Sequence, residues 1–306
     1  MMIPGAVFIQ ADGLPQRNYG ASQLEDGLDV LGRDPCRQGE ESADLPLYPP
    51  CIPVGRGPAI ALIGDSHAAD LADAFRAIAS KSGLGLIEFG GFVGASCLTT
   101  ADLNEEDSSF VDPCVRFNTK RLNYIASHSE IEIAVVSGDW TDSLETDDEG
   151  ESREVTDGQP PSRIGLGHSQ ASLEQGLEES VGQLSRAGKT VYLVQDQPHF
   201  RFNPALLTET RAIRPRYLLS HLLVPRGRWI AGDFAPVPVS SKEETCRRIV
   251  AGIAAKYPNV RVIDLRSELC SGDSCRFAFE GRTLYVDEDH LSDLGAQFAL
   301  AGFHLP

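Results

Sequence analysis

Short apolar runs alternate with amphipathic stretches along most of this chain, and this alternation limits the possible folds more than any other feature. Apolar runs of strand length occur at 59–63, 85–89, 131–137, 190–195 and 260–265. Patterns with helical spacing occur at 68–82, 115–129, 169–187 and 241–256. A small hairpin that turns at Gly281-Arg282 and a last helix at 294–301 are predicted near the C-terminus. Strands that alternate with helices predict an α/β fold, here a three-layer α/β/α sandwich around a parallel sheet.

Three stretches depart from the alternation. Residues 1–57 are rich in Gly, Pro and acidic side chains, so we expect a linker-like lead-in before a single domain at 58–306. Residues 142–157 hold eight acidic side chains and one Arg, which is typical of a solvated loop. Segment 197–239 is rich in Pro and Arg and too long for a simple connection. Insertions of this kind often cover or shape a site.

The composition excludes several classes of protein. Hydrophobic residues make up 42% of the 306-residue chain, which excludes a wholly disordered or low-complexity protein. The 44 acidic residues outnumber the 27 Lys and Arg residues, giving a net charge of −17. A surface this acidic repels phosphate backbones and anionic lipid headgroups, so we expect no nucleic-acid partner and no polybasic membrane anchor. Five arginines form a local exception that could meet an anionic glycan or pair with the acidic loop: Arg211, Arg214, Arg216, Arg226 and Arg228.

Six of the seven cysteines lie in turn-rich stretches, which indicates disulfides formed in an oxidising compartment. The expected pairs are Cys36 with Cys51, Cys97 with Cys114, and Cys270 with Cys275. Cys246 lies in a helical pattern and is left as the free thiol. Zinc is the alternative for the last pair, but no second close cysteine pair and no histidine at ligand spacing accompany it. We therefore expect neither a metal nor another cofactor.

The start of the chain carries no recognisable export signal. Residues 1–10 have no basic start and no long apolar core, and no stretch approaches the ~18 apolar residues of a membrane span. An extracytoplasmic location, in the periplasm or cell envelope, then requires export information outside this chain. That information could have belonged to a larger upstream part.

The turn Gly64-Asp65-Ser66-His67 is the most specific chemical feature of the sequence. It places a serine between a buried strand and a helix, where open α/β sheets bind ligands. The backbone N–H groups of such a turn favour developing negative charge. A serine that only caps the helix is the simpler interpretation of this motif alone.

A second motif near the C-terminus favours a catalytic role for that serine. Asp287 precedes His290 by three residues, and Ser292 is placed to cap the last helix. The carboxylate can accept a hydrogen bond from one imidazole nitrogen while the other nitrogen faces a nucleophile. Activation of this kind is what a serine hydroxyl needs to attack a carbonyl at neutral pH. The alternative is a surface histidine beside solvated charges.

These two motifs resemble those of the SGNH (GDSL-like) hydrolase superfamily. More narrowly, they resemble the SGNH domain associated with membrane acyltransferase family 3 proteins, which O-acetylate bacterial cell-surface polysaccharides. The narrower resemblance rests on His67 after the serine, the phrase 284–287 leading into His290-Leu291-Ser292, the Cys270 and Cys275 pair, and the segment 13–17, which is similar to a linker after membrane helices. It covers roughly residues 13–302, with 142–240 matched only by position, and implies an SGNH/flavodoxin-like three-layer fold with a parallel sheet.

The resemblance also implies roles for particular residues. Ser66 would be the nucleophile, His290 the base and Asp287 the residue that orients the base. The oxyanion hole would include the backbone N–H groups of Ser66 and Gly94. The superfamily's usual asparagine donor is missing, because Ser137-Gly138-Asp139-Trp140 stands in its place. An ionised aspartate cannot donate a hydrogen bond, and the loss of one such donor typically costs ~10²–10³ in rate.

Three further residues are expected at a substrate-binding surface. His67, Asp139 and Trp140 are the candidates, although His67 could cap or pack and Trp140 could belong to the core. The expected function is serine-dependent O-acetyl transfer to a cell-surface polysaccharide, or acetyl removal from it. Its partners would be a glycan, an acetyl donor and a membrane acyltransferase domain. The alternatives are a non-catalytic glycan-binding or scaffold domain, which the altered Asp139-Trp140 block favours, and a general small-ester carboxylesterase.

Overall fold

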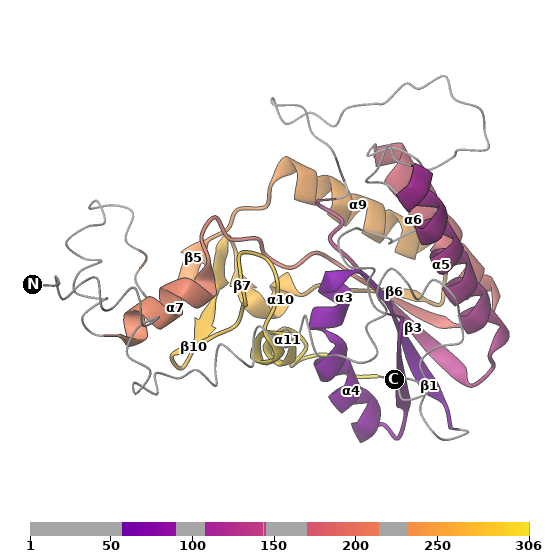
Figure 1. The fold of residues 1–306 in the computed structure, drawn as a ribbon, viewed down its shortest axis with the longest axis horizontal. Coiled ribbons are helices and arrows are strands. Elements are labelled where there is room, and N and C mark those ends of the chain that lie inside the picture. The colour runs from indigo at the N-terminus through magenta and orange to yellow at the C-terminus, as the bar shows by residue number, and fades with distance from the viewer. Residues whose placement is uncertain are drawn as a thin grey trace, which may run out of the picture.

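The computed structural model describes residues 57–89, 108–142, 144, 170–213, 230 and 232–305. Its centre is a five-stranded sheet in the order β2-β1-β3-β4-β6, and every neighbouring pair is parallel (Figure 1). The strands are β1 (Ala59–Gly64), β2 (Gly85–Phe89), β3 (Ile131–Ser137), β4 (Thr190–Val194) and β6 (Val260–Ile263). The sequence predicted all five within two residues at either end. This parallel sheet confirms the expected α/β class.

Alternate side chains of the strands face two separate cores, which makes the three layers. In β1, Ala59, Ala61 and Ile63 pack into one core, whereas Ile60 and Leu62 pack into the other. The first core is covered by α5 (Ser108–Ser127), α6 (Gln170–Arg186) and α9 (Ser241–Lys256). The second is covered by α3 (Ser66–Asp70), α4 (Ala72–Lys81), α10 (Arg266–Leu269) and α11 (Asp293–Ala299), on the other side of the sheet in Figure 1.

The helix predicted at 68–82 is two helices, α3 and α4, that meet at Leu71. The first starts two residues earlier than expected because the Asp65 side chain accepts a hydrogen bond from the His67 backbone N–H and so caps it. Helix α5 also starts earlier than expected, at Ser108. Helix α11 begins after Ser292, whose hydroxyl accepts from the Gly295 N–H, as the sequence predicted.

Short strands extend the domain beyond the main sheet. One sheet has the order β5 (Phe234–Pro236), β8 (Ser274–Arg276) and β7 (Cys270–Ser271), and a hairpin is formed by β9 (Ala278–Phe279) and β10 (Arg282–Thr283). The hairpin turns at Glu280-Gly281, one residue before the predicted position. These two residues have φ angles of 52° and 78°, and two-residue hairpin turns with positive φ at both positions match the strand twist.

The predicted bridge between Cys270 and Cys275 is present, and it joins the paired strands β7 and β8. Cys246 is a buried free cysteine, as expected. Cys36, Cys51 and Cys97 of the other two predicted pairs lie outside what the structure describes, and so does the lead-in 1–57 except for residue 57. Most of the acidic loop 142–157 also lies outside it. The described parts of the 197–239 insertion include α7 (Pro204–Ala212) and β5.

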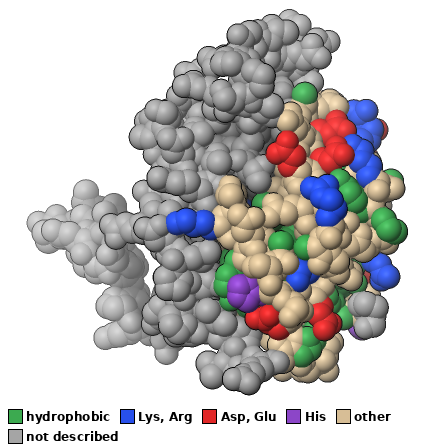
Figure 2. All heavy atoms as spheres, turned by 90° about the vertical axis from the view of Figure 1, so that its right-hand side faces the viewer, with side chains coloured by type: hydrophobic (Ala, Val, Ile, Leu, Met, Phe, Trp, Pro, Cys, Tyr) green, Lys and Arg blue, Asp and Glu red, His purple; other side chains and the backbone are tan. Residues whose placement is uncertain are grey.

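Charges of both signs are mixed on the face that Figure 2 shows. Acidic and basic side chains lie near one another there, rather than gathering into a patch of one sign. Among the described helices, none is long and apolar enough to cross a membrane.

Candidate active site

The site lies at the carboxyl edge of the sheet, where β1 and β3 end side by side. The chain passes from β1 to β2 on one side and then to β3 on the other, so this edge is the point at which open α/β sheets bind ligands. Gly64 and Ser137 are the last paired residues of the two strands. A Cβ at Gly64 would lie 1.8 Å from the Ser137 carbonyl oxygen. Only glycine therefore allows the two strand ends to lie this close, and Ser66 follows immediately.

A buried arginine links the ends of β1 and β2. Arg121, from α5, is 1% exposed and donates hydrogen bonds to the carbonyl oxygens of Phe89 at 3.0 Å and Gly64 at 3.4 Å. Burial lowers the pKa of Arg121 to about 9, while nearby Asp65 opposes that shift. The backbone just before Ser66 is thus held by the Arg121 side chain, which comes from the helical layer that contains α5.

The candidate triad is assembled from the two ends of the domain. Ser66 Oγ and His290 Nε2 are 2.9 Å apart, and His290 Nδ1 lies 2.9 Å from Asp287 Oδ2. When the neutral imidazole carries its proton on Nδ1, it donates to Asp287 and Nε2 accepts from the serine hydroxyl. Asp289 Oδ1 also lies 3.1 Å from Nδ1. Two carboxylates therefore flank the same imidazole nitrogen.

Backbone hydrogen bonds fix the loop that carries His290. Asp287 Oδ1 accepts from the backbone N–H groups of His290 at 2.8 Å and Asp289 at 3.1 Å. Asp70, a buried residue of α3, accepts from the Leu291 N–H at 2.9 Å. Gln197 donates to the Asp289 carbonyl oxygen at 2.5 Å and to Asp70 Oδ2 at 3.3 Å. The loop is thus tied to the same short helix that begins with the candidate nucleophile.

The carboxylates control the charge of His290. Burial by itself would lower the pKa of His290, but hydrogen bonds to Asp287 and Asp289 and the nearby charge of Asp70 outweigh it and raise the pKa to about 11. Burial raises the pKa of Asp70 to about 6 against the opposing effect of the histidines. Burial opposes ionisation of Asp289 as well, yet His290 and His67 hold its pKa well below the usual range. The neutral, basic form of His290 is therefore favoured at alkaline pH.

His67 lies among three other polar side chains beside the triad. It is 2% exposed, and its Nε2 lies 3.6 Å from Asp139 Oδ2 and 3.9 Å from Asp289 Oδ2. Its ring meets the rings of His290 and His199 edge to face, with centroids 5.2 Å and 5.7 Å apart. Burial would lower the pKa of His67, but the surrounding carboxylates, Asp289 first among them, raise it to about 10.

Trp140 is a core residue rather than part of an open surface. Its side chain is 0% exposed and packs in the core covered by α5, α6 and α9, and its indole N–H donates to the Val194 carbonyl oxygen at 2.7 Å. Asp196 accepts from the Trp140 backbone N–H at 2.9 Å and from the Thr141 hydroxyl. Burial and the nearby charge of Asp139 raise the pKa of Asp196 to about 7. This packing supports the core alternative for Trp140.

The structure brings together Ser66, His290, Asp287, His67 and Asp139, as the sequence predicted for one site. Gly94, the other expected oxyanion donor, lies outside the described residues. Four residues at the site were not predicted: Asp70, Gln197, His199 and Asp289. Asp289 could have been considered because it lies between Asp287 and His290, but the other three carry no local sequence signal.

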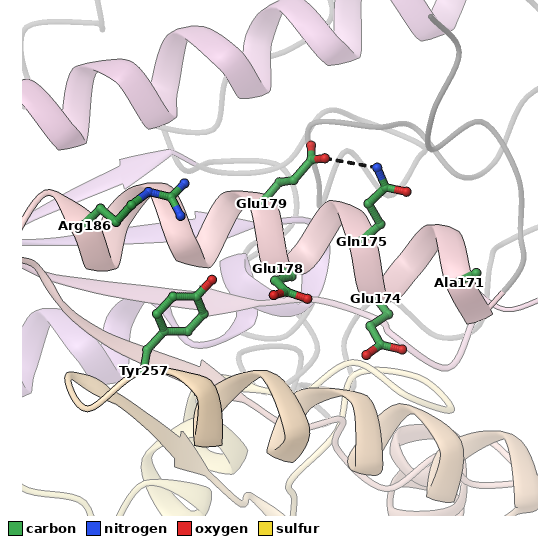
Figure 3. Close-up of a pocket in the computed structure, with 7 residues that line it drawn as sticks. All are labelled: Ala171, Glu174, Gln175, Glu178, Glu179, Arg186 and Tyr257. Carbon is green, nitrogen blue, oxygen red and sulfur yellow. Dashed lines mark hydrogen bonds between the residues drawn. The ribbon is translucent and has the colours of Figure 1, made fainter. Parts of the chain in front are cut away.

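A separate hollow lies beside α6 and the end of α9, and none of the site residues named above lines it. It has a volume of about 480 Å³ and is lined by Ala171, Glu174, Gln175, Glu178, Glu179 and Arg186 of α6 together with Tyr257 after α9 (Figure 3). Lys256 pairs with Glu178 at 2.6 Å and lies 3.7 Å from Glu174. None of the triad residues lines this hollow, so it does not contribute to the candidate active site.

One solved structure supports this fold, and a second is less similar to it. The periplasmic domain of a lipopolysaccharide acetyltransferase from Salmonella ser. Paratyphi A superposes with a TM-score of 0.53 at 17% identity, over 82% of this chain and 83% of that one. A protein described as a candidate platelet activating factor from Streptococcus pneumonia has a TM-score of 0.43 at 11% identity, over 98% and 97% of the two chains. A comparison with curated proteins finds no match.

The family comparison covers most of the sequence. The model described as "SGNH domain (fused to AT3 domains)" matches residues 32–304, which include both motifs of the candidate site and every described strand and helix. The chain therefore belongs to the family of SGNH domains that are fused to AT3 domains.

Proposed function

We propose that this domain transfers an O-linked acetyl group to a bacterial cell-surface polysaccharide, or removes one from it, through an acetyl-Ser66 intermediate. The observation that carries the proposal is the continuous chain of contacts from Ser66 Oγ to His290 Nε2 and from His290 Nδ1 to Asp287, each 2.9 Å long. This is the geometry in which an imidazole can accept the proton of an attacking hydroxyl. A capping serine alone would have no need of that imidazole.

The first half of the reaction forms the acyl-enzyme. Ser66 Oγ attacks the acetyl carbonyl carbon while its proton passes to His290 Nε2, and Asp287 stabilises the resulting imidazolium. The backbone N–H of Ser66 can donate to the oxyanion of the tetrahedral intermediate. When that intermediate collapses, the bond to the leaving group breaks and His290 returns the proton to the leaving oxygen. Acetyl-Ser66 and a neutral His290 remain.

The second half decides between transfer and hydrolysis. A sugar hydroxyl or a water molecule attacks acetyl-Ser66, His290 takes the proton of the attacking oxygen, and Ser66 leaves with that proton. Membership of a family fused to AT3 domains supports a membrane acyltransferase partner that supplies the acetyl group. The likeness in fold to a lipopolysaccharide acetyltransferase periplasmic domain supports an extracytoplasmic location and a glycan acceptor.

The test follows release of p-nitrophenol from p-nitrophenyl acetate by the wild type and by Ser66→Ala, with and without a polysaccharide acceptor. We expect the wild type to release p-nitrophenol. The rate of Ser66→Ala should be lower than that of the wild type by a factor of about 10³ or more, because the nucleophile is gone. Acceptor-dependent formation of acetylated glycan, detected by mass spectrometry, would select transfer over hydrolysis. Equal rates for the two proteins would overturn the nucleophile assignment and leave the non-catalytic scaffold.

Ser292→Ala is the matched control for the serine substitution. Ser292 caps α11 next to the His290 loop, and its hydroxyl contacts Gly295 and Thr283 rather than the triad histidine. It should cost stability but leave an ester-cleaving rate well above that of Ser66→Ala. A loss of activity as large as that of Ser66→Ala would mean that general disruption of the site explains both results.

A further inference from the structure

Two histidines and two aspartates from four separate segments converge beside Ser66. They are His67 after β1, Asp139 after β3, His199 after β4 and Asp289 before α11. Each offers one nitrogen or oxygen atom, and these four atoms all lie within 4.8 Å of one another. We propose that this group, the His₂Asp₂ cluster, binds a divalent transition-metal ion with the preferences of Zn²⁺.

The spacing of the cluster suits a tetrahedral ion. His67 Nε2 lies 3.6 Å from Asp139 Oδ2 and 3.9 Å from Asp289 Oδ2, and His199 Nε2 lies 3.9 Å from Asp139 Oδ1. With zinc bonds to nitrogen and oxygen of about 2.0–2.2 Å, the ligands of a tetrahedral site are separated by about 3.3–3.6 Å. These three separations are thus at or a few tenths of an ångström above this range, and the remaining pairs lie within 4.8 Å. The four side chains would have to move closer together by this difference when an ion binds.

Three pairs of ligand atoms in the cluster are 3.6–3.9 Å apart. All three separations exceed the distance of a genuine hydrogen bond. Among the described residues, His199 Nε2 is in addition a buried atom with no hydrogen-bond partner. A buried polar atom without a partner costs free energy, and a metal ion at the centre of the cluster would give His199 Nε2 a partner.

The chemistry of the four ligands selects among ions. Two carboxylates balance a double positive charge, and two imidazole nitrogens favour zinc and its neighbours in the transition series. Calcium and magnesium prefer sites built from oxygen atoms alone. The cluster therefore fits Zn²⁺ better than either of these ions. An entry path exists because the side chains of Asp139, Asp289 and His199 are 15%, 29% and 33% exposed.

A second group of possible ligands, Asp287, Asp289 and His290, lies next to the cluster. Its contacts are short, since Asp287 and Asp289 lie 2.9 Å and 3.1 Å from His290 Nδ1. Those atoms already hydrogen-bond to one another. Asp289 belongs to both groups, with Oδ1 toward His290 and Oδ2 toward His67. A metal ion in the cluster would therefore share a carboxylate with the candidate base without displacing it.

The test titrates chelator-stripped protein with Zn²⁺ by isothermal calorimetry, without reductant so that disulfides stay closed. We expect one ion per chain for the wild type, no comparable binding of Mg²⁺, and at least a tenfold weaker Zn²⁺ affinity for His199→Gln. His304→Gln is the matched control, because His304 is exposed and lies outside the cluster. Asp139→Asn is the second variant and should weaken binding as well, and circular dichroism checks that each variant is folded.

Several results would overturn the proposal. The first is the absence of Zn²⁺ binding by the wild type, and the second is an equal Zn²⁺ affinity of His199→Gln and His304→Gln. The third is Zn²⁺ binding that is lost in His290→Gln but kept in His199→Gln, which would place the ion at the triad. Co²⁺ tests the wild type without any variant, because a four-coordinate site gives intense visible absorption and a six-coordinate one gives weak bands. Weak bands would count against the cluster. Ser66→Ala should bind Zn²⁺ like the wild type, so this outcome is independent of the acetyl-transfer proposal.

Discussion

The carboxylate of Asp65 joins the loop after β1 to the backbone of Asp139 after β3. Oδ1 accepts from the His67 N–H and Oδ2 accepts from the Asp139 N–H, each at 2.9 Å. Burial raises the pKa of Asp65, while nearby His67 and these hydrogen bonds oppose the shift. One side chain thus caps the helix that begins with Ser66 and sets the distance between two loops of the site.

We expect Asp65→Ala to lower the free energy of unfolding by about 1–3 kcal/mol, because it removes a helix cap and leaves the Asp139 N–H without this acceptor. Asp65→Asn keeps a single carbonyl oxygen and should fall between the wild type and the alanine variant. Urea unfolding at neutral pH, followed by circular dichroism, measures both changes. An alanine variant as stable as the wild type would show that the two hydrogen bonds make no net contribution to the free energy of unfolding.

Gly64 and Gly252 should respond in opposite directions to alanine. A Cβ at Gly64 would lie 1.8 Å from Ser137 O and 2.6 Å from Ala68 Cβ, so Gly64→Ala should cost about 3 kcal/mol or more. Gly252 is exposed within α9, and an added Cβ there would meet nothing within 4 Å. Gly252→Ala should therefore raise the free energy of unfolding by about 0.5–1 kcal/mol. Equal destabilisation by both changes would contradict this account of the strand ends.

The two carboxylates beside His290 should differ in their effect on turnover. Asp287 contacts Nδ1 and also accepts two backbone N–H groups of its own loop, whereas Asp289 contacts Nδ1 from a longer distance. Asp287→Asn should lower kcat for p-nitrophenyl acetate by about 10²–10⁴-fold, because the amide favours the wrong tautomer. Asp289→Asn should lower it less than about 10-fold. If kcat falls more in Asp289→Asn than in Asp287→Asn, Asp289 rather than Asp287 is the residue that orients His290.

The pH profile of ester cleavage should report the raised pKa of His290. General-base activity needs the neutral imidazole, and a pKa above the ordinary 6.5 keeps the proton on the ring until the pH is higher. In buffer with EDTA, kcat/KM should therefore rise with pH and reach half its maximum above pH 6.5. Asp289→Asn removes one carboxylate that holds this proton and should shift the midpoint to lower pH. A wild-type midpoint at or below pH 6.5 would contradict the electrostatic account.

The bridge between Cys270 and Cys275 should stabilise the small sheet beside the site. A disulfide that closes a loop this short restricts the unfolded chain, and this restriction is expected to raise the free energy of unfolding by about 2 kcal/mol. The variant with both Cys270→Ala and Cys275→Ala should lose about that much in urea unfolding without reductant. The matched control is Cys246→Ala, in which a buried free thiol is removed and the bridge remains. An unchanged midpoint in the double variant would show that pairing of β7 with β8 is sufficient.

Local patterns in the sequence were enough to predict the five strands and most helices of the domain. Strand faces repeat every two residues and helix faces every three to four, so burial on both sides of a parallel sheet leaves a periodic signal. The Ser292 cap and the Cys270–Cys275 bridge were predictable for the same reason, because each depends on residues a few positions apart. The roles assigned to Ser66, His290 and Asp287 came from two motifs and stay predictions until they are tested by mutation.

The arrangement of the site depends on contacts that no local pattern records. The Ser66–His290 contact joins positions 224 residues apart, the Asp65–Asp139 contact joins positions 74 apart, and the approach of His199 to Asp139 comes from the order of β3 and β4 in the sheet. The environment of Trp140 could not be predicted for the same reason, because a tryptophan at a strand end looks the same in the sequence whether it faces a ligand or the core. Short-range periodicity and capping were enough to locate the strands, helices and turns along the chain. Which polar side chains meet at the carboxyl edge became known from the folded chain alone, because strand order and packing set the distances between them.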